Sequence, residues 1–443
     1  MPTRVYKHKA LFLVVPVLTA AAAAVFSACF TPATRVDVTA VFPQKAWAQT
    51  PVVFKPVAGA GLSAADCARC HAEHVADWKL STHAHALQDL QFQAELAKAS
   101  SPKWLCLNCH TPLGNQREEL VRYLDKGNIL KPIGEKNAHF NPQLKNESVT
   151  CGVCHFRQDA DGETKIIAAK QHTSAPHPLV ADPVGLRSRC LDCHNVSETV
   201  NAQLVCSFQT GDELAAGYLA GKQDCAGCHM RETQGKNATA RHRHSFIGGG
   251  VAKTYALLGQ QSKAGYLSAL QFSLHGVKAS SGGLTANLII FNSGTGHRVP
   301  TGDPERFVEI RLTAFDAHGK RIAEQTERIG QTWQWSPVAR KVADNRILPG
   351  EKREMQFHFT AAPEIHSLIL EARHVRLTTE NARYMKQDAA HAEKTYAQKI
   401  AQIEAHYPFS RVIFKESHNL KTGAKSTASP AELERLSLAA QGR

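Results

Sequence analysis

One pattern of cysteine and histidine, Cys-X-X-Cys-His, occurs five times in the chain and constrains its fold more than any other feature. The five copies are Cys67, Cys70 and His71; Cys106, Cys109 and His110; Cys151, Cys154 and His155; Cys190, Cys193 and His194; and Cys225, Cys228 and His229. Cysteines three residues apart share one face of a helical turn, so both thiols can form thioethers with the vinyl groups of one haem. The histidine that follows can reach the iron. The motifs predict five covalently attached c-type haems.

Closely spaced cysteines also occur in zinc sites and in disulfide scaffolds. Ten of the twelve cysteines belong to the five motifs, and zinc sites do not require histidine directly after the second cysteine. We therefore interpret the motifs as haem attachment sites. Cys206 belongs to no motif, and three roles stay open for it: a buried inert thiol, a disulfide partner of Cys29, or a reactive group near the fifth haem. The inert thiol is our expectation.

The first 49 residues have the plan of an export signal or a membrane anchor. Arg4, Lys7 and Lys9 precede 21 uncharged residues, from Ala10 to Phe30. Three fates fit: lipidation at Cys29, cleavage after Ala48, or retention as an anchor, which needs about 20 apolar residues. We expect an exported periplasmic protein, tethered to the membrane or a lipoprotein, facing the periplasm or the cell surface.

The formal charge of +13 does not by itself indicate an acidic partner. Removal of residues 1–28 deletes three basic residues and no acidic ones, which leaves a charge of +10. Each ferric haem with ionised propionates adds one negative charge, so five haems bring the total to about +5. No run of lysine and arginine interleaved with aromatic residues occurs, and no nucleic acid partner is implied.

The second axial ligands of the irons are expected to be histidines. The chain has four methionines, while 18 of its 23 histidines lie outside the motifs. Several of these histidines lie in segments placed to reach a haem: His74, His83, His85, His172, His177, His242, His244 and His297. The last lies in the glycine-rich loop NSGTGHRVPTGDPER, from Asn292 to Arg306, where we expect it to bind an iron and join two domains.

Several of these segments resemble multihaem c-type cytochromes of the superfamily that contains the tetrahaem cytochrome of nitrifying bacteria, pentahaem nitrite reductase and octahaem hydroxylamine oxidoreductase. The resemblance is carried in order by CARCHAEHVADWKLSTHAHA, CLNCHTPLG, VTCGVCHF, DCAGCHM, HSFIGG and GTGHRVPTGDP. It implies that His83, His244 and His297 are distal ligands, with His177 as a weaker fourth. The catalytic nitrite reductases of that superfamily replace one proximal histidine by lysine, which this chain does not.

The sequence predicts an α+β protein of several domains. Residues 50–250 are expected to form a pentahaem cytochrome domain, mainly helical and irregular and organised by its haems. Residues 251–284 are expected to be a helical connector, with a helix over 255–270, and residues 285–377 a small β-sandwich. In FVEIRLTAF, alternate residues from Val308 to Ala314 are apolar, which predicts a strand with one buried face. Residues 378–443 are expected to be a C-terminal helix ending before Pro408, followed by a flexible tail.

These features favour an electron carrier, in which five haems pass electrons between periplasmic or membrane redox partners such as a quinol dehydrogenase or other cytochromes. The alternative is a haem oxidoreductase that acts on a small nitrogen, sulfur or peroxide substrate at one five-coordinate haem. A third hypothesis gives the β-sandwich the role of docking to a partner protein. No catalytic residue independent of the haems is predicted.

Overall fold

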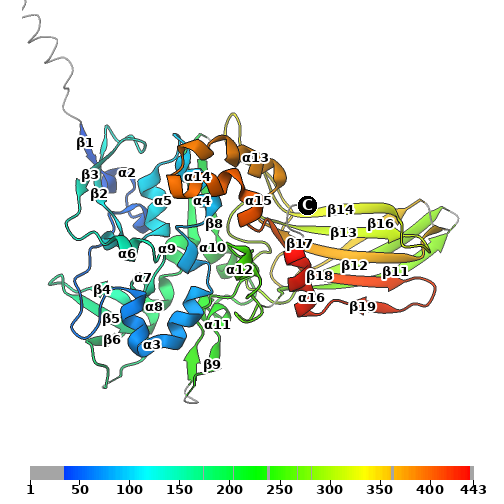
Figure 1. The fold of residues 1–443 in the computed structure, drawn as a ribbon, viewed down its shortest axis with the longest axis horizontal. Coiled ribbons are helices and arrows are strands. Elements are labelled where there is room, and N and C mark those ends of the chain that lie inside the picture. The colour runs from blue at the N-terminus through cyan, green and yellow to red at the C-terminus, as the bar shows by residue number, and fades with distance from the viewer. Residues whose placement is uncertain are drawn as a thin grey trace, which may run out of the picture.

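The computed structural model describes residues 34–172, 174–202, 204–236, 240–266, 268–280, 282–360 and 364–439. The predicted apolar segment from Ala10 to Phe30, and Cys29 within it, lie outside these residues. In the described ranges no helix is long and apolar enough to cross a membrane. Figure 1 shows two parts side by side along the long axis of the molecule. Short helices and strands make up one part, and long strands make up the other.

The first part extends to residue 266 and consists of short elements. Its helices are α2 (Val38–Val41), α3 (Ala64–Lys79), α4 (Leu90–Ala97), α5 (Lys103–His110), α6 (Pro142–Lys145), α7 (Cys151–His155), α8 (Pro183–Ser188), α9 (Leu191–His194), α10 (Thr210–Ala215), α11 (Cys225–His229) and α12 (Tyr255–Leu258), with the 3-10 turns η1 (Ala46–Ala48), η2 (His83–His85) and η3 (Gly114–Gln116). Its strands are β1 (Arg35–Asp37), β2 (Glu119–Asp125), β3 (Pro132–Lys136), β4 (Phe156–Gln158), β5 (Thr164–Ala168), β6 (Leu179–Ala181), β7 (Asn195–Asn201), β8 (Leu204–Gln209), β9 (Glu232–Gln234) and β10 (Ala240–His242). These strands form small sheets of two or three strands.

Apolar packing in this first part is divided into small separate clusters. One gathers Trp104 and Leu124, another Phe54 and Leu144, and a third lies around Trp78. No single aliphatic core joins these clusters within the described residues, which is the arrangement expected of a domain organised around large prosthetic groups.

Residues 34–49, which the sequence assigned to the N-terminal signal or anchor, are folded into this first part. Strand β1 pairs antiparallel with β2, and Val38 and Ala48 are buried in the cluster around Trp104. The predicted boundary at residue 49 is therefore too late. Cleavage after Ala48 would remove a strand and buried side chains, and apolar side chains buried at 0–2% exposure contribute to stability.

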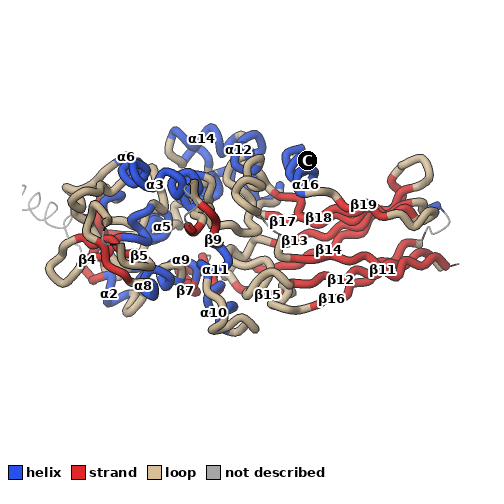
Figure 2. Tube along the Cα trace, turned by 90° about the horizontal axis from the view of Figure 1, so that it is seen from below, coloured by secondary structure: helices blue, strands red, loops and turns tan. Residues whose placement is uncertain are grey.

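The second part is a β-sandwich of two antiparallel sheets. One sheet has the order β11-β12-β16, formed by β11 (Leu270–Ser280), β12 (Gly283–Asn292) and β16 (Lys352–Phe359). The other has the order β15-β14-β13-β17-β18-β19, formed by β13 (Phe307–Phe315), β14 (Arg321–Gln334), β15 (Arg340–Asp344), β17 (Ser367–Val375), β18 (Ser410–Asn419) and β19 (Lys425–Thr427). Figure 2 shows the two sheets as two layers.

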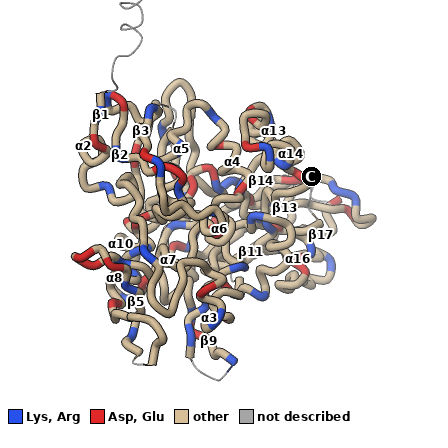
Figure 3. The backbone as a smooth tube through the Cα atoms, turned by 60° about the vertical axis from the view of Figure 1, so that its left-hand side comes forward, with Lys and Arg blue, Asp and Glu red and all other residues tan. Residues whose placement is uncertain are grey.

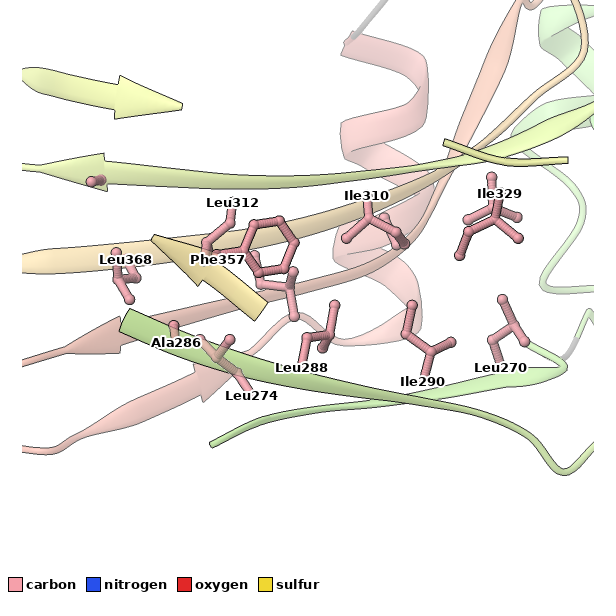
Figure 4. Close-up of a cluster of buried hydrophobic side chains, with 14 of the residues drawn as sticks. Leu270, Leu274, Ala286, Leu288, Ile290, Ile310, Leu312, Ile329, Phe357 and Leu368 are labelled. Atoms are coloured by element: carbon pink, nitrogen blue, oxygen red, sulfur yellow. The ribbon is translucent and has the colours of Figure 1, made fainter. Parts of the chain in front are cut away.

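The core of the sandwich lies between these layers. Leu288 and Ile290 of β12 point towards Ile310 and Leu312 of β13, and all four side chains are fully buried (Figure 4). The alternation predicted for FVEIRLTAF is confirmed, since Val308, Ile310, Leu312 and Ala314 are at most 1% exposed.

Two predicted boundaries around the sandwich are wrong. The expected connector over 251–284 contains only the short helix α12, because Gly259 ends it, and β11 already begins at Leu270. The tail after Leu420 is not without structure, because it contains β19 and α16 (Pro430–Ala439). The sandwich therefore extends from residue 270 to 427, with residues 376–409 crossing back over the first part.

The predicted C-terminal helix is broken into several pieces. These are α13 (Thr379–Gln387), η5 (Ala389–His391), α14 (Lys394–Ala401) and α15 (Ile403–His406). The three breaks fall at Asp388, at Ala392 with Glu393, and at Gln402, whose backbone angles are not helical. The apolar stripe is buried as predicted: Met385, Ile400 and Tyr407 pack against Leu90 and Ala94 of α4. This segment therefore fastens the end of the chain to the first part.

Basic and acidic residues are interspersed over both parts, as Figure 3 shows. Many of them form exposed ion pairs, such as Lys55 with Glu163 and Arg122 with Glu135. Basic and acidic residues therefore lie close together in many places of the described chain.

Candidate haem-binding sites

Each Cys-X-X-Cys-His motif lies on a helical turn, as its spacing predicts. The motifs lie in α3, α5, α7, α9 and α11, with Cys190 directly before α9. Four of these helices end at the motif histidine, namely His110, His155, His194 and His229. In α3 the backbone is kinked at His71, where φ is −110° and ψ is 41°. The histidine therefore stands at a helix end or a kink in every motif.

The fold brings motifs that are distant in sequence into contact. The thiol of Cys67 lies beside that of Cys151, and the thiols of Cys109 and Cys193 form a second neighbouring pair. A third pair joins Cys190 to Cys225. All eleven described cysteines are free of disulfides. The first motif thus adjoins the third, and the fourth adjoins both the second and the fifth.

Three motif histidines have their rings held by backbone carbonyls. Nδ1 of His110 lies 2.7 Å from the carbonyl oxygen of Ala86, and Nδ1 of His155 lies 2.9 Å from that of Ile167. Nδ1 of His229 contacts the carbonyl of Ile247 in the same way. An Nδ1–H that donates to a carbonyl leaves the Nε2 lone pair free, which is the usual arrangement of a metal-binding histidine.

Three motif histidines also face a histidine from outside the motifs. Ring centroids are 6.3 Å apart for His155 and His244, 6.3 Å for His229 and His297, and 6.1 Å for His194 and His83. Two imidazoles on opposite sides of one metal ion have centroids about 6 Å apart, because each metal–nitrogen bond is about 2 Å long. The structure therefore brings His83, His244 and His297, which the sequence predicts as distal ligands, next to motif histidines.

Burial favours the neutral form of five of these six histidines. Burial lowers the pKa of His83 to about 3 and the pKa of His244 to about 4. Burial also lowers the pKa of His155, His194 and His297. The neutral imidazole is the form that binds iron, so burial prepares these side chains as ligands.

The first motif has two neighbouring histidines. Burial, and then the neighbouring His177, lower the pKa of His71, and the described residues show no aromatic contact between these two rings. The ring of His74 lies 5.7 Å from that of His71 at 79°, and 4.8 Å from that of His244 at 84°. The structure thus brings His177, which the resemblance implies as a weaker fourth distal ligand of no stated motif, near the first motif, where His74 is a competitor.

The remaining candidates point elsewhere. Nε2 of His85 lies 3.0 Å from the carbonyl of Lys79 in its own segment. Nδ1 of His242 lies 2.7 Å from the carbonyl of Met230, and His172 is exposed. None of the three shares an aromatic contact with a motif histidine in the described part of the chain.

The second motif differs from the other four. The ring of His110 stacks on Phe92 with centroids 3.4 Å apart and planes at 6°, and no histidine ring contacts it among the described residues. Cys206 lies near this motif, because it acts electrostatically on Cys106 and Cys109. The hypothesis that Cys206 lies near the fifth haem is therefore wrong, because it lies near the second motif. Burial raises the pKa of Cys206 to about 11, as for an unreactive thiol.

One histidine with similar features was not singled out in the sequence. His374 on β17 is 8% exposed, its Nδ1 contacts the carbonyl of Gly249, and its Nε2 has no partner. In HSLILEARHVRL it is hidden within an ordinary strand pattern. A histidine at a buried position of a predicted strand is the only sequence signal that would have drawn attention to it.

Comparison with known proteins agrees with these observations. Residues 66–156, which contain the first three motifs, match a protein-family model described as cytochrome c554 and c-prime. Over 83% of this chain and 100% of the other, the structure matches the penta-haem cytochrome c552 from Thermochromatium tepidum, with a TM-score of 0.57 and 20% sequence identity. The fold is that of a multihaem cytochrome.

The two multihaem matches support haem c as the cofactor. The likeness to cytochrome c552 also extends well beyond residues 66–156. A second structural match, the β-glucuronidase from Bacteroides uniformis, has a TM-score of 0.13 and 12% identity over 36% of this chain and 12% of the other, so it says nothing about this chain. No curated protein sequence matches the chain.

Proposed function

We propose that this protein is a pentahaem c-type cytochrome that carries electrons between periplasmic or membrane redox partners. The observation that carries the proposal is the facing of motif and non-motif histidines at centroid separations of 6.1–6.3 Å. Irons held between two histidines have no open coordination position, and such haems transfer electrons rather than bind substrates.

The residues present fit covalently attached haem. The motif thiols would form the thioethers, and His71, His110, His155, His194 and His229 would be the proximal ligands. The proposed distal ligands are His83, His177, His244 and His297. When bound, the haem supplies reversible one-electron exchange at its iron. Backbone carbonyls hold the rings of His110, His155 and His229, and burial favours the neutral form of His83 and His244.

Contacts between motifs support transfer along the molecule. Because thiols of the first and third motifs touch, as do those of the fourth and fifth, haems attached to them are neighbours. Cys154 and Cys193 interact electrostatically, which connects the third motif to the fourth. The proposed route therefore follows the motifs in the order first, third, fourth and fifth, with the second beside the fourth.

The N-terminal segment supports an exported, membrane-tethered protein. Since Ala48 is buried, cleavage after it is disfavoured, and lipidation at Cys29 or retention of residues 10–30 as an anchor remains. Either tether would hold the haems beside membrane electron donors such as a quinol dehydrogenase, or beside other cytochromes.

The test is to count and characterise the haems of the purified protein. We expect five haems per chain by pyridine haemochrome assay, and low-spin electron paramagnetic resonance signals for those facing a second histidine. Fewer haems, or high-spin signals from the third, fourth and fifth motifs, would contradict the proposal.

A second function, a haem oxidoreductase for a small nitrogen, sulfur or peroxide substrate, is favoured by the second motif alone. There His110 contacts Phe92 instead of a histidine. A haem at this motif with an open position would be high-spin and would bind carbon monoxide when reduced. One such haem supports this function, and five low-spin haems that do not bind carbon monoxide exclude it.

A further inference from the structure

An open cavity lies where the sandwich meets α10, beside the fifth motif. Its volume is about 350 Å³. Arg298, Lys341 and Leu348 line it from the sandwich, and Tyr218 lines it from the turn after α10. Figure 2 shows β15, which carries Lys341, at the end of the sandwich that lies next to α10. Both parts of the molecule therefore border this cavity.

Large apolar side chains at the cavity and along the neighbouring β15 are open to solvent. Tyr218 is 48% exposed and Leu348 is 46% exposed. Val338, in the turn before β15, is 54% exposed, and Val342 of β15 is 59% exposed. These four are among the ten large hydrophobic side chains exposed in the described residues, so such side chains are concentrated here. Exposed apolar surface of this kind marks sites where another protein binds.

Two tryptophans extend this surface along the end of β14. Trp333 lies directly opposite Lys341 in the pairing of β14 with β15, so the two side chains point to the same side of the sheet. The rings of Trp333 and Trp335 stack with centroids 5.2 Å apart and planes inclined by 12°, and both side chains are half-buried. Tryptophan, tyrosine and arginine contribute most to binding at protein interfaces. We call the following residues the junction surface: Tyr218, Arg298, Trp333, Trp335, Lys341 and Leu348.

The turn between β14 and β15 is held in place by the first part of the molecule. The amide of Ala339 donates to the carbonyl of Ala202, in the turn between β7 and β8, at 2.7 Å. Nε1 of Trp333 donates to the side-chain oxygen of Gln331, also at 2.7 Å. A surface that is already ordered loses little conformational entropy when a partner binds.

Exposed cations lie at the junction surface. The side chains of Arg298 and Lys341 are 37% and 39% exposed, and they lie 3.2 and 3.7 Å from the same carboxylate, that of Asp344. The side chain of Asp344 is only 13% exposed. Arg340, next to Lys341 in β15, is also exposed. One largely buried carboxylate is thus shared by two exposed cations.

The other acidic side chains at the cavity do not offset these cations. Glu213 is 7% exposed and forms an ion pair of 2.6 Å with Arg346, which is 3% exposed, so the two are neutral as a pair. Asp212 is exposed on the α10 side of the cavity, where it accepts a hydrogen bond of 2.9 Å from Asn195. The exposed charge of the junction surface is therefore positive on balance, which is complementary to an acidic protein.

Only a short length of chain separates the cavity from the fifth motif. Arg298 directly follows His297, whose ring faces that of His229. The backbone of Gly296 lies so close to α10 that a Cβ on it would be 2.6 Å from Cδ1 of Leu214. The junction surface thus lies directly outside the histidine pair of the fifth motif.

We propose that the junction surface binds an acidic electron-transfer protein, which exchanges electrons with the fifth haem. This inference rests on the proposed function, in which the fifth motif is one end of the route between the haems. The partner gives or takes one electron at the iron held between His229 and His297. Partner and iron change oxidation state in opposite directions, and no bond forms or breaks. The cations steer the partner to the surface, and the aromatic rings exclude water from the contact.

The experiment uses reduced flavodoxin, an acidic electron carrier, as the probe. Stopped-flow absorbance measures how fast it reduces the oxidised haem-loaded protein at low ionic strength. Lys341→Glu reverses one charge of the junction surface, and Trp335→Ala removes one stacked ring. Lys320→Glu is the control, because Lys320 is exposed in the turn before β14, at the opposite end of that strand from Trp335. Haem content and reduction by dithionite are measured first for each protein.

We expect Lys341→Glu to lower the second-order rate constant about tenfold, because the reversed charge repels the acidic partner. Added salt should diminish this difference, since it screens exposed charges. Trp335→Ala should also lower the rate constant, and salt should not remove its effect. Lys320→Glu should react like the unaltered protein.

Equal rate constants for Lys341→Glu, Trp335→Ala and Lys320→Glu would overturn the proposal. A dimer of the unaltered protein in sedimentation velocity that Trp335→Ala converts to a monomer would also overturn it, because a second copy of this chain would then cover the surface. A protein without haem, or one that dithionite does not reduce, would refute the proposed function and this inference with it. Should Lys341→Glu fail to fold, Lys341→Gln replaces it, with a smaller decrease expected.

Discussion

The imidazole rings of His229 and His297 face each other with centroids 6.3 Å apart and planes inclined by only 12°. His229 ends the helix of the fifth motif, whereas His297 lies in the loop between β12 and β13 of the sandwich. The loop is held in place, since the hydroxyl of Thr295 and the amide of Asn292 both donate to the carbonyl of His297. A metal ion between the two rings would join the two parts of the molecule.

We therefore expect His297→Ala to convert one haem from six-coordinate to five-coordinate. One of the five haems should change from low-spin to high-spin, and the reduced variant should bind one more carbon monoxide per chain than the unaltered protein. Electron paramagnetic resonance and carbon monoxide difference spectra measure this change. His318→Ala, at an exposed turn of the sandwich, is the matched control, and unchanged spectra in His297→Ala would show that His297 binds no iron.

A second prediction separates the two histidines near the first motif. His177 acts on His71 electrostatically, while the His74 ring lies edge-on to both His71 and His244. We expect His177→Ala to yield one five-coordinate haem and His74→Ala to leave every haem low-spin. Resonance Raman spin-state markers of the two variants decide between them, and the opposite result would assign the ligand to His74.

The local chemistry of the motifs was predictable, whereas their mutual arrangement was not. Spacing alone places Cys151, Cys154 and His155 on one helical turn, because the helix repeat is local. The contact of Cys67 with Cys151 depends on long irregular connections, whose course no periodicity records. The resemblance and the glycine-rich loop predicted His297 as a ligand. Only the structure shows which motif it faces.

Errors in the fold have equally local causes. The alternating apolar residues predicted β13 correctly, because one face of this strand is buried in the core of the sandwich. The apolar residues from Met385 to Tyr407 keep a helical spacing across Asp388 and Gln402. The sequence pattern therefore did not reveal the breaks at these two residues. The partner of His374, the carbonyl of Gly249, comes from a segment far away in the chain, which is why this histidine was not recognised.

A third prediction concerns the contact between α10 and the sandwich. Glu213 on α10 forms an ion pair of 2.6 Å with Arg346, with side chains 7% and 3% exposed, and also accepts a hydrogen bond of 2.7 Å from Thr301. Arg346 would keep its ion pair with Asp344 at 2.9 Å, so the loss corresponds to a hydrogen bond between charged groups, which contributes about 1.5–3 kcal/mol. Glu213→Ala should therefore lower the unfolding free energy by roughly that amount.

The unfolding free energy is measured by chemical denaturation of the haem-loaded protein, followed by circular dichroism. Glu163→Ala is the control, since Glu163 pairs with Lys55 at the surface with side chains 54% and 62% exposed. An exposed pair contributes about 0–1 kcal/mol. Equal losses in the two variants would mean that the Glu213–Arg346 pair does not hold the two parts together.

The last prediction concerns pH and rests on Glu305, in the loop before β13. Burial, and then the neighbouring charge of Asp303, raise the pKa of Glu305 to about 7, from 4.5 for an ordinary glutamate. The folded protein thus holds this proton more tightly than the unfolded chain does. The stabilisation from Glu305 is complete below about pH 4.5 and is lost as the pH rises towards about 7.

Glu305→Gln removes the titration, so the unfolding free energy of the variant should fall less steeply over this window. Denaturation of both proteins from pH 4.5 to 8 measures the difference, and parallel curves would show that Glu305 ionises in the folded protein at its ordinary pKa.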